Sequence, residues 1–233
     1  MSIKIENIQT MGWEGALRGM RNPLNSWAKA DSDYASNIVR NDINIAAYGS
    51  KLSRYDFIIG QNDLALCLKL VKAGSEHRKF LRMIHVQMDI IAPLYWWKEF
   101  ETYKVGTTSN SCSAMHKIAA KPFELGDEVL EDIIDHLNFW RDKYLASPSD
   151  KRIWWQMIQL LPSSYNQRRT VDMSMETVLN ILSQRHSHKL DEWVEFCDIM
   201  LSKLPYAEDF YLAEGGVCPD SNDHEQKGEP DGN

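Results

Sequence analysis

The chain has 233 residues, of which 43% are hydrophobic, and it carries a formal net charge of -7 with an isoelectric point near 5.5. This length and apolar content are sufficient for one buried core. The acidic balance excludes general nucleic-acid binding, which needs clustered cations, although it allows a local basic pocket for a small anion. The sequence contains no run of about 18 apolar residues, so no membrane span is expected.

The cysteines are widely spaced, which predicts free thiols in a reducing compartment and excludes a zinc knuckle or a redox CxxC motif. They are Cys67, Cys112, Cys197 and Cys218. The first residues contain no apolar segment of the kind found in secretory signals. We therefore expect a cytoplasmic protein without a membrane partner.

The N-terminal region predicts one strand and one helix. Residues 3–9 alternate between apolar and polar, which indicates a strand. Residues Trp13 to Met20 have helical spacing, and Asn22-Pro23 ends that helix because the residue before proline avoids the helical region. Polar and aromatic side chains gather at this break, namely Arg18, Arg21, Asn22, Asn25 and Trp27. Two interpretations stay open: a capped helix end in a polar turn, or the donor-rich lip of a ligand pocket.

The middle of the chain predicts a second helix, a strand and an aromatic helix. Residues 58–63 indicate a strand end, a turn and a helix N-cap. Residues 83–91 alternate, which predicts a strand with one buried face. Pro93 suits the first turn of a helix over residues 94–103. Residues 106–113 are dense in hydroxyls, and we interpret them as a loop whose short polar groups could cup an anion or a base.

The C-terminal half predicts four amphipathic helices. Their apolar residues run from Val129 to Tyr144, from Ile153 to Leu161, from Met175 to Leu182 and from Leu190 to Leu204. A polar loop is expected over residues 163–170. The composition of residues 214–233 predicts a disordered acidic tail. We therefore predict a single α+β domain over residues 1–213.

No Walker loop or GxGxxG motif is present in the sequence, so the usual nucleotide fingerprints are missing. A composite nucleotide site is predicted instead, from aromatic rings that stack on a base, arginine forks that bind phosphate, and small hydroxyls. Its residues are Trp96, Trp97, Lys98, Glu101, Tyr103, Lys104, Thr107, Thr108, Ser109, Asn110, Ser111, Arg168, Arg169 and Arg185. The alternative interpretation is two buried tryptophans and solvated arginines.

No metal site is predicted. His186, His188 and Glu192 could look like metal ligands, but only His188 and Glu192 share one helical face, and no third ligand for that face is evident nearby. We interpret these residues as a solvated helix start. No catalytic residue is assigned.

The second half of the chain resembles the flavin-dependent thymidylate synthases. The residues that carry the resemblance are Leu161-Pro162, Tyr165, Gln167, Thr170-Val171, Asn180, Leu182, Arg185, His188 and Glu192-Trp193. The resemblance covers roughly residues 60–205. It implies a helix-rich α+β fold around a small, mostly antiparallel sheet, and a homotetramer with sites between subunits. It also suggests a divergent protein of a bacterial virus or prophage.

The family's Arg-His-Arg motif, which holds the flavin and the uridylate, is not retained. Glu101-Thr102-Tyr103 stands in its place, and Ser111 matches the family's downstream serine. Ile158 and Glu176 stand where the family has arginines on the substrate phosphate. A carboxylate and a phenol in place of two guanidinium groups reverse the local charge. We therefore expect no bound cofactor, and we keep FAD as the alternative.

The favoured hypothesis is a nucleotide-binding protein on a thymidylate synthase-like scaffold, without the standard methyl transfer. A concrete version is an anti-defence protein that sequesters a host nucleotide signal in the host cytoplasm. One alternative is a flavin-dependent or related enzyme that modifies a pyrimidine nucleotide, with Glu99, Glu101 or Tyr103 as acid–base groups. Another is a structural or interaction protein whose aromatic cluster is only core.

Overall fold

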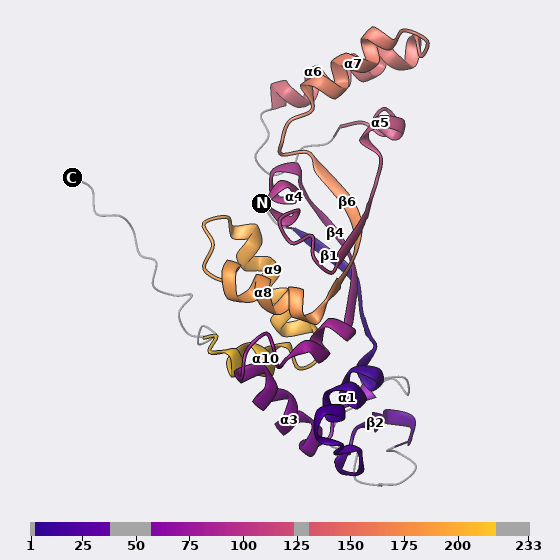
Figure 1. Cartoon of the computed structure of the whole chain (residues 1–233). Coiled ribbons are helices and arrows are strands. Elements are labelled where there is room, and N and C mark those ends of the chain that lie inside the picture. The colour runs from indigo at the N-terminus through magenta and orange to yellow at the C-terminus, as the bar shows by residue number, and fades with distance from the viewer. Residues whose placement is uncertain (1–2, 38–56, 124–130, 218–233) are drawn as a thin grey trace, which may run out of the picture.

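The structure, a computed structural model, describes residues 3–37, 57–123 and 131–217 (Figure 1). Its centre is an antiparallel sheet of four strands in the order β1-β4-β6-β5. The strands are β1 (Lys4–Met11), β4 (His85–Pro93), β6 (Asn166–Ser174) and β5 (Thr107–Ser111). A small second sheet pairs β2 (Asp33–Tyr34) with β3 (Phe57–Ile58). This architecture confirms the predicted α+β class.

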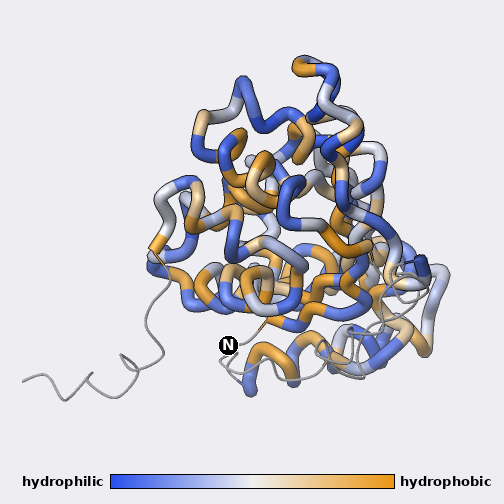
Figure 2. Tube along the Cα trace, turned by 90° about the horizontal axis from the view of Figure 1, so that it is seen from below, coloured by the Kyte–Doolittle hydropathy of each residue, from blue (hydrophilic) through white to orange (hydrophobic). Residues whose placement is uncertain are grey.

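Helices make up most of the rest of the described chain. They are α1 (Trp13–Arg21), α3 (Gln61–Lys72), α4 (Leu94–Phe100), α5 (Ala114–Lys117), α6 (Glu131–Ala146), α7 (Lys151–Leu160), α8 (Met175–Arg185), α9 (Asp191–Lys203) and α10 (Ala207–Glu214). Short 3-10 turns cover Asn22–Leu24 (η1), Trp27–Lys29 (η2) and Lys79–Met83 (η4). Hydrophobic and hydrophilic stretches alternate along the tube in Figure 2, as expected of amphipathic elements that each bury one face. Of the helices in the described ranges, none is long and apolar enough to cross a membrane.

One face of the sheet builds the main core. Alternate residues of the two central strands point to this face because side chains in a strand have a period of two. Val86, Met88 and Ile90 of β4 and Val171 and Met173 of β6 are at most 1% exposed. Helices α8 and α9 lie on this side of the sheet in Figure 1 and contribute Leu182, Trp193 and Phe196 to the same core.

The opposite face of the sheet is polar and faces solvent, as antiparallel sheets allow. Glu6, Asp89, Thr170 and Asn110 form one row across the four strands. The carboxylate of Asp89 accepts hydrogen bonds from Thr170 (2.6 Å), Arg168 (2.7 Å) and Asn7 (2.8 Å). These bonds lower the pKa of Asp89 to about 2, which keeps the residue ionised.

Helices α5, α6 and α7 form an arm with a separate small core. The arm lies at the far end of the β5–β6 ribbon from α1 and α3 (Figure 1). Its buried residues are Ile118, Ala119, Phe123, Leu137 and Met157. Large apolar side chains such as Phe139 and Trp155 are about half exposed.

Two predicted loops are strands, so those predictions are wrong. Residues Thr107–Ser111 form the edge strand β5, which pairs antiparallel with β6. Thr107 lies opposite Met173, and Ser111 lies opposite Arg169. Strand β6 begins at Asn166, inside the predicted loop 163–170. Hydroxyl side chains suit an edge strand because the backbone is paired while the side chains stay in water.

The chain end also differs from the prediction. The last predicted helix stops at Lys203, and an unpredicted helix, α10, follows after Tyr206, whose φ is 61°. Glu214, the first residue of the predicted tail, is the last residue of α10, and its carboxylate accepts a hydrogen bond from the Ser183 hydroxyl (2.9 Å). This residue is therefore ordered and not part of a disordered tail. Residues 218–233 and Val129 lie outside the described residues.

Candidate functional site

The end of α4 and the turn that follows it, together residues 99–103 and called the α4 turn below, lie between two arginine side chains. The first is Arg169, on the core-facing side of β6. Its guanidinium lies 4.4 Å from the centre of the Trp97 ring and donates to Glu101 (3.0 Å) and to the side chain of Gln167 (3.0 Å). The aromatic face and the two acceptors hold this cation in one orientation.

Arg185, the last residue of α8, is the second cation at the turn. Its guanidinium lies 4.9 Å from the centre of the Trp193 ring. It donates to Glu99 (2.8 Å) and to the hydroxyl of Tyr103 (3.0 Å), and Tyr103 in turn donates to Gln184 (3.1 Å). The sequence places Arg185 here because α8 ends at this residue and its last turn faces the end of α4.

His188 completes this cluster from the α8–α9 connection. Its Nδ1 accepts the backbone N–H of Leu190 (3.2 Å), so in the neutral ring the proton lies on Nε2. That nitrogen is 2.7 Å from an Arg185 nitrogen, which is also a donor, and 3.6 Å from the Glu99 carboxylate. Glu99 additionally accepts the indole N–H of Trp193 (3.1 Å). Several donors thus compete for one carboxylate, and the arginine can change partner at little cost.

The structure does not support the predicted stacking platform. Trp96 and Trp97 are 0% exposed. The Trp96 ring lies 4.5 Å from the Trp193 ring and 5.1 Å from the Phe100 ring, measured between centroids. The prediction that their faces receive a base is wrong because α4 turns both rings into the core. The two tryptophans support the site from beneath.

The predicted cleft shared by Arg168 and Arg169 is also wrong. Consecutive residues of a strand point to opposite faces of the sheet. Arg169 lies on the helix-covered face, whereas Arg168 lies on the polar face and pairs with Asp89 (2.7 Å) and Glu6 (3.1 Å). The composition of the segment could not separate them, because it did not reveal that both belong to one strand.

The β5 residues divide between the two faces in the same way. Ser111 lies opposite Arg169 and shares its face, as do Ser109 and Thr107, while Thr108 and Asn110 lie on the polar face. Lys98 and Lys104 are exposed near the turn. The structure therefore gathers Glu101, Tyr103, Ser111, Arg169 and Arg185 from the predicted set. Gln184 and His188 were missed, although His188 stands three residues after Arg185 in the motif that carries the resemblance.

Within the described ranges, no group of three or more His, Cys, Asp and Glu side chains could hold a metal ion. Burial raises the pKa of the Cys197 thiol to about 12, and that of Cys67 equally, so neither is a nucleophile near neutral pH.

No protein-family model matches the chain, and no curated protein sequence matches it either. Solved structures do. Thymidylate synthase X (ThyX) from Helicobacter pylori, solved with FAD and dUMP, superposes with a TM-score of 0.59 at 14% identity over 91% of this chain and 96% of that chain. A second structure, of flavin-dependent thymidylate synthase ThyX from the same organism complexed with FAD and dUMP, gives a TM-score of 0.59 at 14% identity over 94% and 100%.

The chain has the ThyX fold. The fold that the resemblance implied is confirmed by these two structures. In this ThyX-like chain the two arginines of the site are each paired with a carboxylate, as Arg169 with Glu101 and Arg185 with Glu99. The carboxylates are the exposed partners, at 56% for Glu101 and 36% for Glu99, so an incoming anion can displace a carboxylate into water while the arginine stays in place.

Proposed function

We propose that the chain binds a nucleotide at the α4 turn and does not perform the standard methyl transfer of thymidylate synthases. The observation that carries the proposal is the pair of guanidinium groups on either side of residues 99–103, each lying over a tryptophan ring and each held by one exchangeable carboxylate. A guanidinium fork held in this way suits a phosphate monoester, which it can bind through two parallel hydrogen bonds.

Binding proceeds by exchange of partners. The phosphate takes the place of the Glu99 or Glu101 carboxylate on its arginine, and the carboxylate turns into water. Glu101 is the easier of the two to displace, since 56% of its side chain is exposed compared with 36% for Glu99. The hydroxyl of Tyr103 and the amide of Gln184 supply hydrogen bonds beside the phosphate that suit a sugar or a base edge.

The donor set does not fit the diphosphate of FAD in the same way. The two arginines and the two carboxylates of the turn sum to zero formal charge, so each further phosphate needs the loss of a carboxylate or a further cation, for which the exposed Lys98 and Lys104 lie near the turn. Glu101 and Tyr103 stand at the positions of the family's Arg-His-Arg motif and provide no such cation. We therefore expect FAD to bind at this turn less readily than a mononucleotide.

The proposed role is binding without turnover. A viral protein that sequesters a host nucleotide signal would work in this way, and an anti-defence function follows if the signal belongs to host immunity. A homotetramer would place a neighbouring subunit against the half-exposed side of each site. The two ThyX structures described above contain dUMP, so a uridine mononucleotide is the first ligand to test.

Isothermal titration calorimetry tests the proposal with dUMP, the other mononucleotides and a panel of cyclic nucleotides. We expect binding of at least one of them, and a loss of affinity of about tenfold or more in Arg169→Ala and Arg185→Ala, as expected for a charge-assisted hydrogen bond. The matched control is Arg168→Ala, which removes the neighbouring arginine on the opposite face of the sheet and should leave the affinity unchanged.

Two results contradict the proposal. One is the absence of heat with every nucleotide at millimolar concentration. The other is an equal loss of affinity in Arg168→Ala and Arg169→Ala. Chromatography of the recovered ligand decides whether it leaves chemically unchanged, as binding without turnover requires.

A flavin-dependent enzyme that modifies a pyrimidine nucleotide is the second candidate, because FAD is present in both similar structures. Here the purified protein, or the protein incubated with FAD and passed over a desalting column, should show the visible absorbance of oxidised flavin. Stoichiometric flavin uptake together with conversion of the nucleotide would replace the binding-only proposal.

A further inference from the structure

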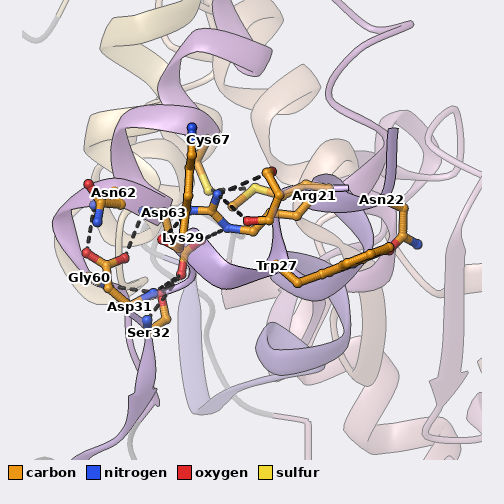
Figure 3. Close-up of polar contacts among 12 residues, drawn as sticks. Arg21, Asn22, Trp27, Lys29, Asp31, Ser32, Gly60, Asn62, Asp63 and Cys67 are labelled. Carbon is orange, nitrogen blue, oxygen red and sulfur yellow. Dashed lines mark hydrogen bonds and ion pairs between the residues drawn. The ribbon is translucent and has the colours of Figure 1, made fainter. Parts of the chain in front are cut away.

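A cavity of about 490 Å³ lies between the segment after α1 and the start of α3, at the end of the molecule away from the α6–α7 arm (Figures 1 and 3). Leu24, Ala28 and Leu66 give it an apolar wall, and Arg21, Lys29 and Asn62 give it polar groups. Cavities of about 300–1,000 Å³ with an apolar wall and a few polar groups are the usual sites of small molecules. Of the polar and aromatic residues that the sequence singled out in segment 18–27, Arg21 lines this cavity.

A buried ion pair forms the rigid back of this cavity. Arg21 and Asp63 have side chains that are 4% and 1% exposed, and their closest nitrogen and oxygen are 2.6 Å apart (Figure 3). The second oxygen of Asp63 accepts from the backbone N–H groups of Asp31 (3.1 Å) and Ser32 (3.1 Å) and from the Ser32 hydroxyl (2.6 Å). The pair therefore holds the segment after α1 firmly against α3.

Burial by itself would raise the pKa of Asp63, but the hydrogen bonds from Ser32 and Arg21 outweigh it and lower this pKa. Asp63 is therefore ionised near neutral pH, and its charge is balanced by Arg21. The cavity wall carries no net charge from this pair.

Arg21 has a donor left over for a ligand. A guanidinium group carries five N–H donors. In the described part of the chain its acceptors are four: Asp63, the carbonyls of Ser26 (3.3 Å) and Lys29 (3.1 Å), and the Ser26 hydroxyl (3.5 Å). Lys29 is exposed at the cavity, and no carboxylate among the described residues pairs with its ammonium group.

The N-terminus of α3 is already occupied and is not the anion site. The two carboxylate oxygens of Asp31 accept the backbone N–H groups of Asn62 (2.8 Å) and Asp63 (3.0 Å) (Figure 3). An anion entering this cavity is therefore directed to Lys29 and to the remaining N–H of Arg21.

We propose that this cavity is a second ligand site, which takes a small molecule with a flat apolar body and one anionic end. The body lies against Leu24, Ala28 and Leu66, and the carboxylate or phosphate end meets Lys29 and Arg21. Trp27 lies in the same segment but outside the cavity lining: its ring is half exposed, and its indole N–H donates to Asn22 (2.8 Å) (Figure 3).

Methyl NMR of the full chain, labelled at leucine and alanine methyl groups, tests the site. The probes are phenylacetate, phenyl phosphate and the neutral benzyl alcohol. We expect saturable shifts at Leu24, Ala28 and Leu66, with the anionic probes binding about tenfold more tightly than benzyl alcohol, the gain typical of one charge-assisted contact. The comparison of phenylacetate with phenyl phosphate shows which anion the site prefers.

The variant Lys29→Gln should weaken the two anionic probes and leave benzyl alcohol unchanged. Lys72→Gln, on the same helix as Leu66 but not at the cavity, is the matched control. In Arg185→Ala the shifts of Leu24, Ala28 and Leu66 should be unchanged with all three probes, even where phenyl phosphate binds less at the proposed nucleotide site, which separates the two sites. The proposal is overturned if these methyl groups do not shift, if the neutral probe binds as tightly as the anions, or if Lys29→Gln binds like the unaltered chain.

Discussion

Two arginine–carboxylate pairs in this molecule have the same chemistry and opposite surroundings. In Arg21–Asp63 both side chains are at most 4% exposed, and both oxygens of the carboxylate accept hydrogen bonds. In Arg185–Glu99 the exposed fractions are 19% and 36%, and a histidine and an indole compete for the same carboxylate. The first pair joins two segments of the fold, and the second leaves its arginine able to change partner.

Solvent explains the difference. A buried charge that loses its partner keeps the full cost of its desolvation, so neither residue of a buried pair can be removed cheaply. A half-exposed charge that loses its partner is taken up by water, so the pair contributes little to stability. The same argument predicts that a ligand can replace the carboxylate of Arg185–Glu99, whereas it can bind only beside Arg21–Asp63, whose carboxylate stays in place.

The largest expected effect comes from breaking the buried pair. Arg21→Met leaves Asp63 charged and buried, and should lower the free energy of unfolding by about 3–5 kcal/mol. Arg185→Ala should lower it by less, about 1–2 kcal/mol, from the lost ion pair and the lost contact with the Trp193 ring. Urea unfolding followed by tryptophan fluorescence measures both, and equal losses in the two variants would show that the two pairs do not differ in role.

Gly60→Ala should have the next largest effect. A Cβ at Gly60 would lie 2.3 Å from both the carboxyl carbon and the backbone oxygen of Asp31, so the residue that caps α3 must move. We expect a loss of about 1–3 kcal/mol in unfolding free energy, the usual cost of overpacking.

Gly15→Ala is the matched control for this substitution. Its Cβ would meet no atom closer than the Met83 methyl carbon at 4.0 Å, and it lies inside α1. This variant should be stabilised by about 0.5–1 kcal/mol, because alanine is the better helix residue. Destabilisation of both variants to the same extent would contradict the role given to Asp31.

The smallest expected effect is on the polar face of the sheet and depends on pH. Hydrogen bonds from Thr170, Arg168 and Asn7 lower the pKa of Asp89 from its ordinary 3.8 to about 2. As the pH falls, Asp89 is protonated in the unfolded chain before it is protonated in the folded chain. The stabilisation from Asp89 is therefore complete above about pH 4 and is lost as the pH falls towards 2.

In Asp89→Asn this part of the acid dependence should disappear, so the urea midpoint should fall less between pH 4 and pH 2 than in the unaltered chain. Asp132→Asn, an exposed carboxylate on α6, serves as the control and should behave like the unaltered chain. If the urea midpoint of Asp89→Asn falls as much between pH 4 and pH 2 as that of the unaltered chain, the hydrogen bonds to Asp89 do not explain the acid dependence.

Much of the fold could be predicted from local patterns. The alternation in residues 3–9 and 83–91 corresponds to β1 and β4, and the helical spacing from Trp13, Ile153 and Met175 corresponds to α1, α7 and α8. The residue order around Leu161-Pro162 and Arg185 pointed to the fold that the solved ThyX structures share. These signals lie within one element or its ends, where a single stretch of sequence suffices.

The candidate site could be predicted only in part. The hydroxyl-rich segment 107–111 has no strong strand pattern of its own, and it is a strand because β6 pairs with it. The burial of Trp96 and Trp97 depends on α9, about a hundred residues away in the sequence, as the contact between Trp96 and Trp193 illustrates. Sequence spacing within α4 contains no information about that partner.

The amino-acid sequence by itself determined most of the elements and the α+β class, because propensity and periodicity act over a few neighbouring residues. Tertiary structure alone decided that Arg168 and Arg169 serve opposite faces, that Arg185 meets the end of α4, and that Arg21 closes the back of a cavity. Those outcomes depend on which strands pair and which helices pack, and such contacts join residues that are far apart along the chain.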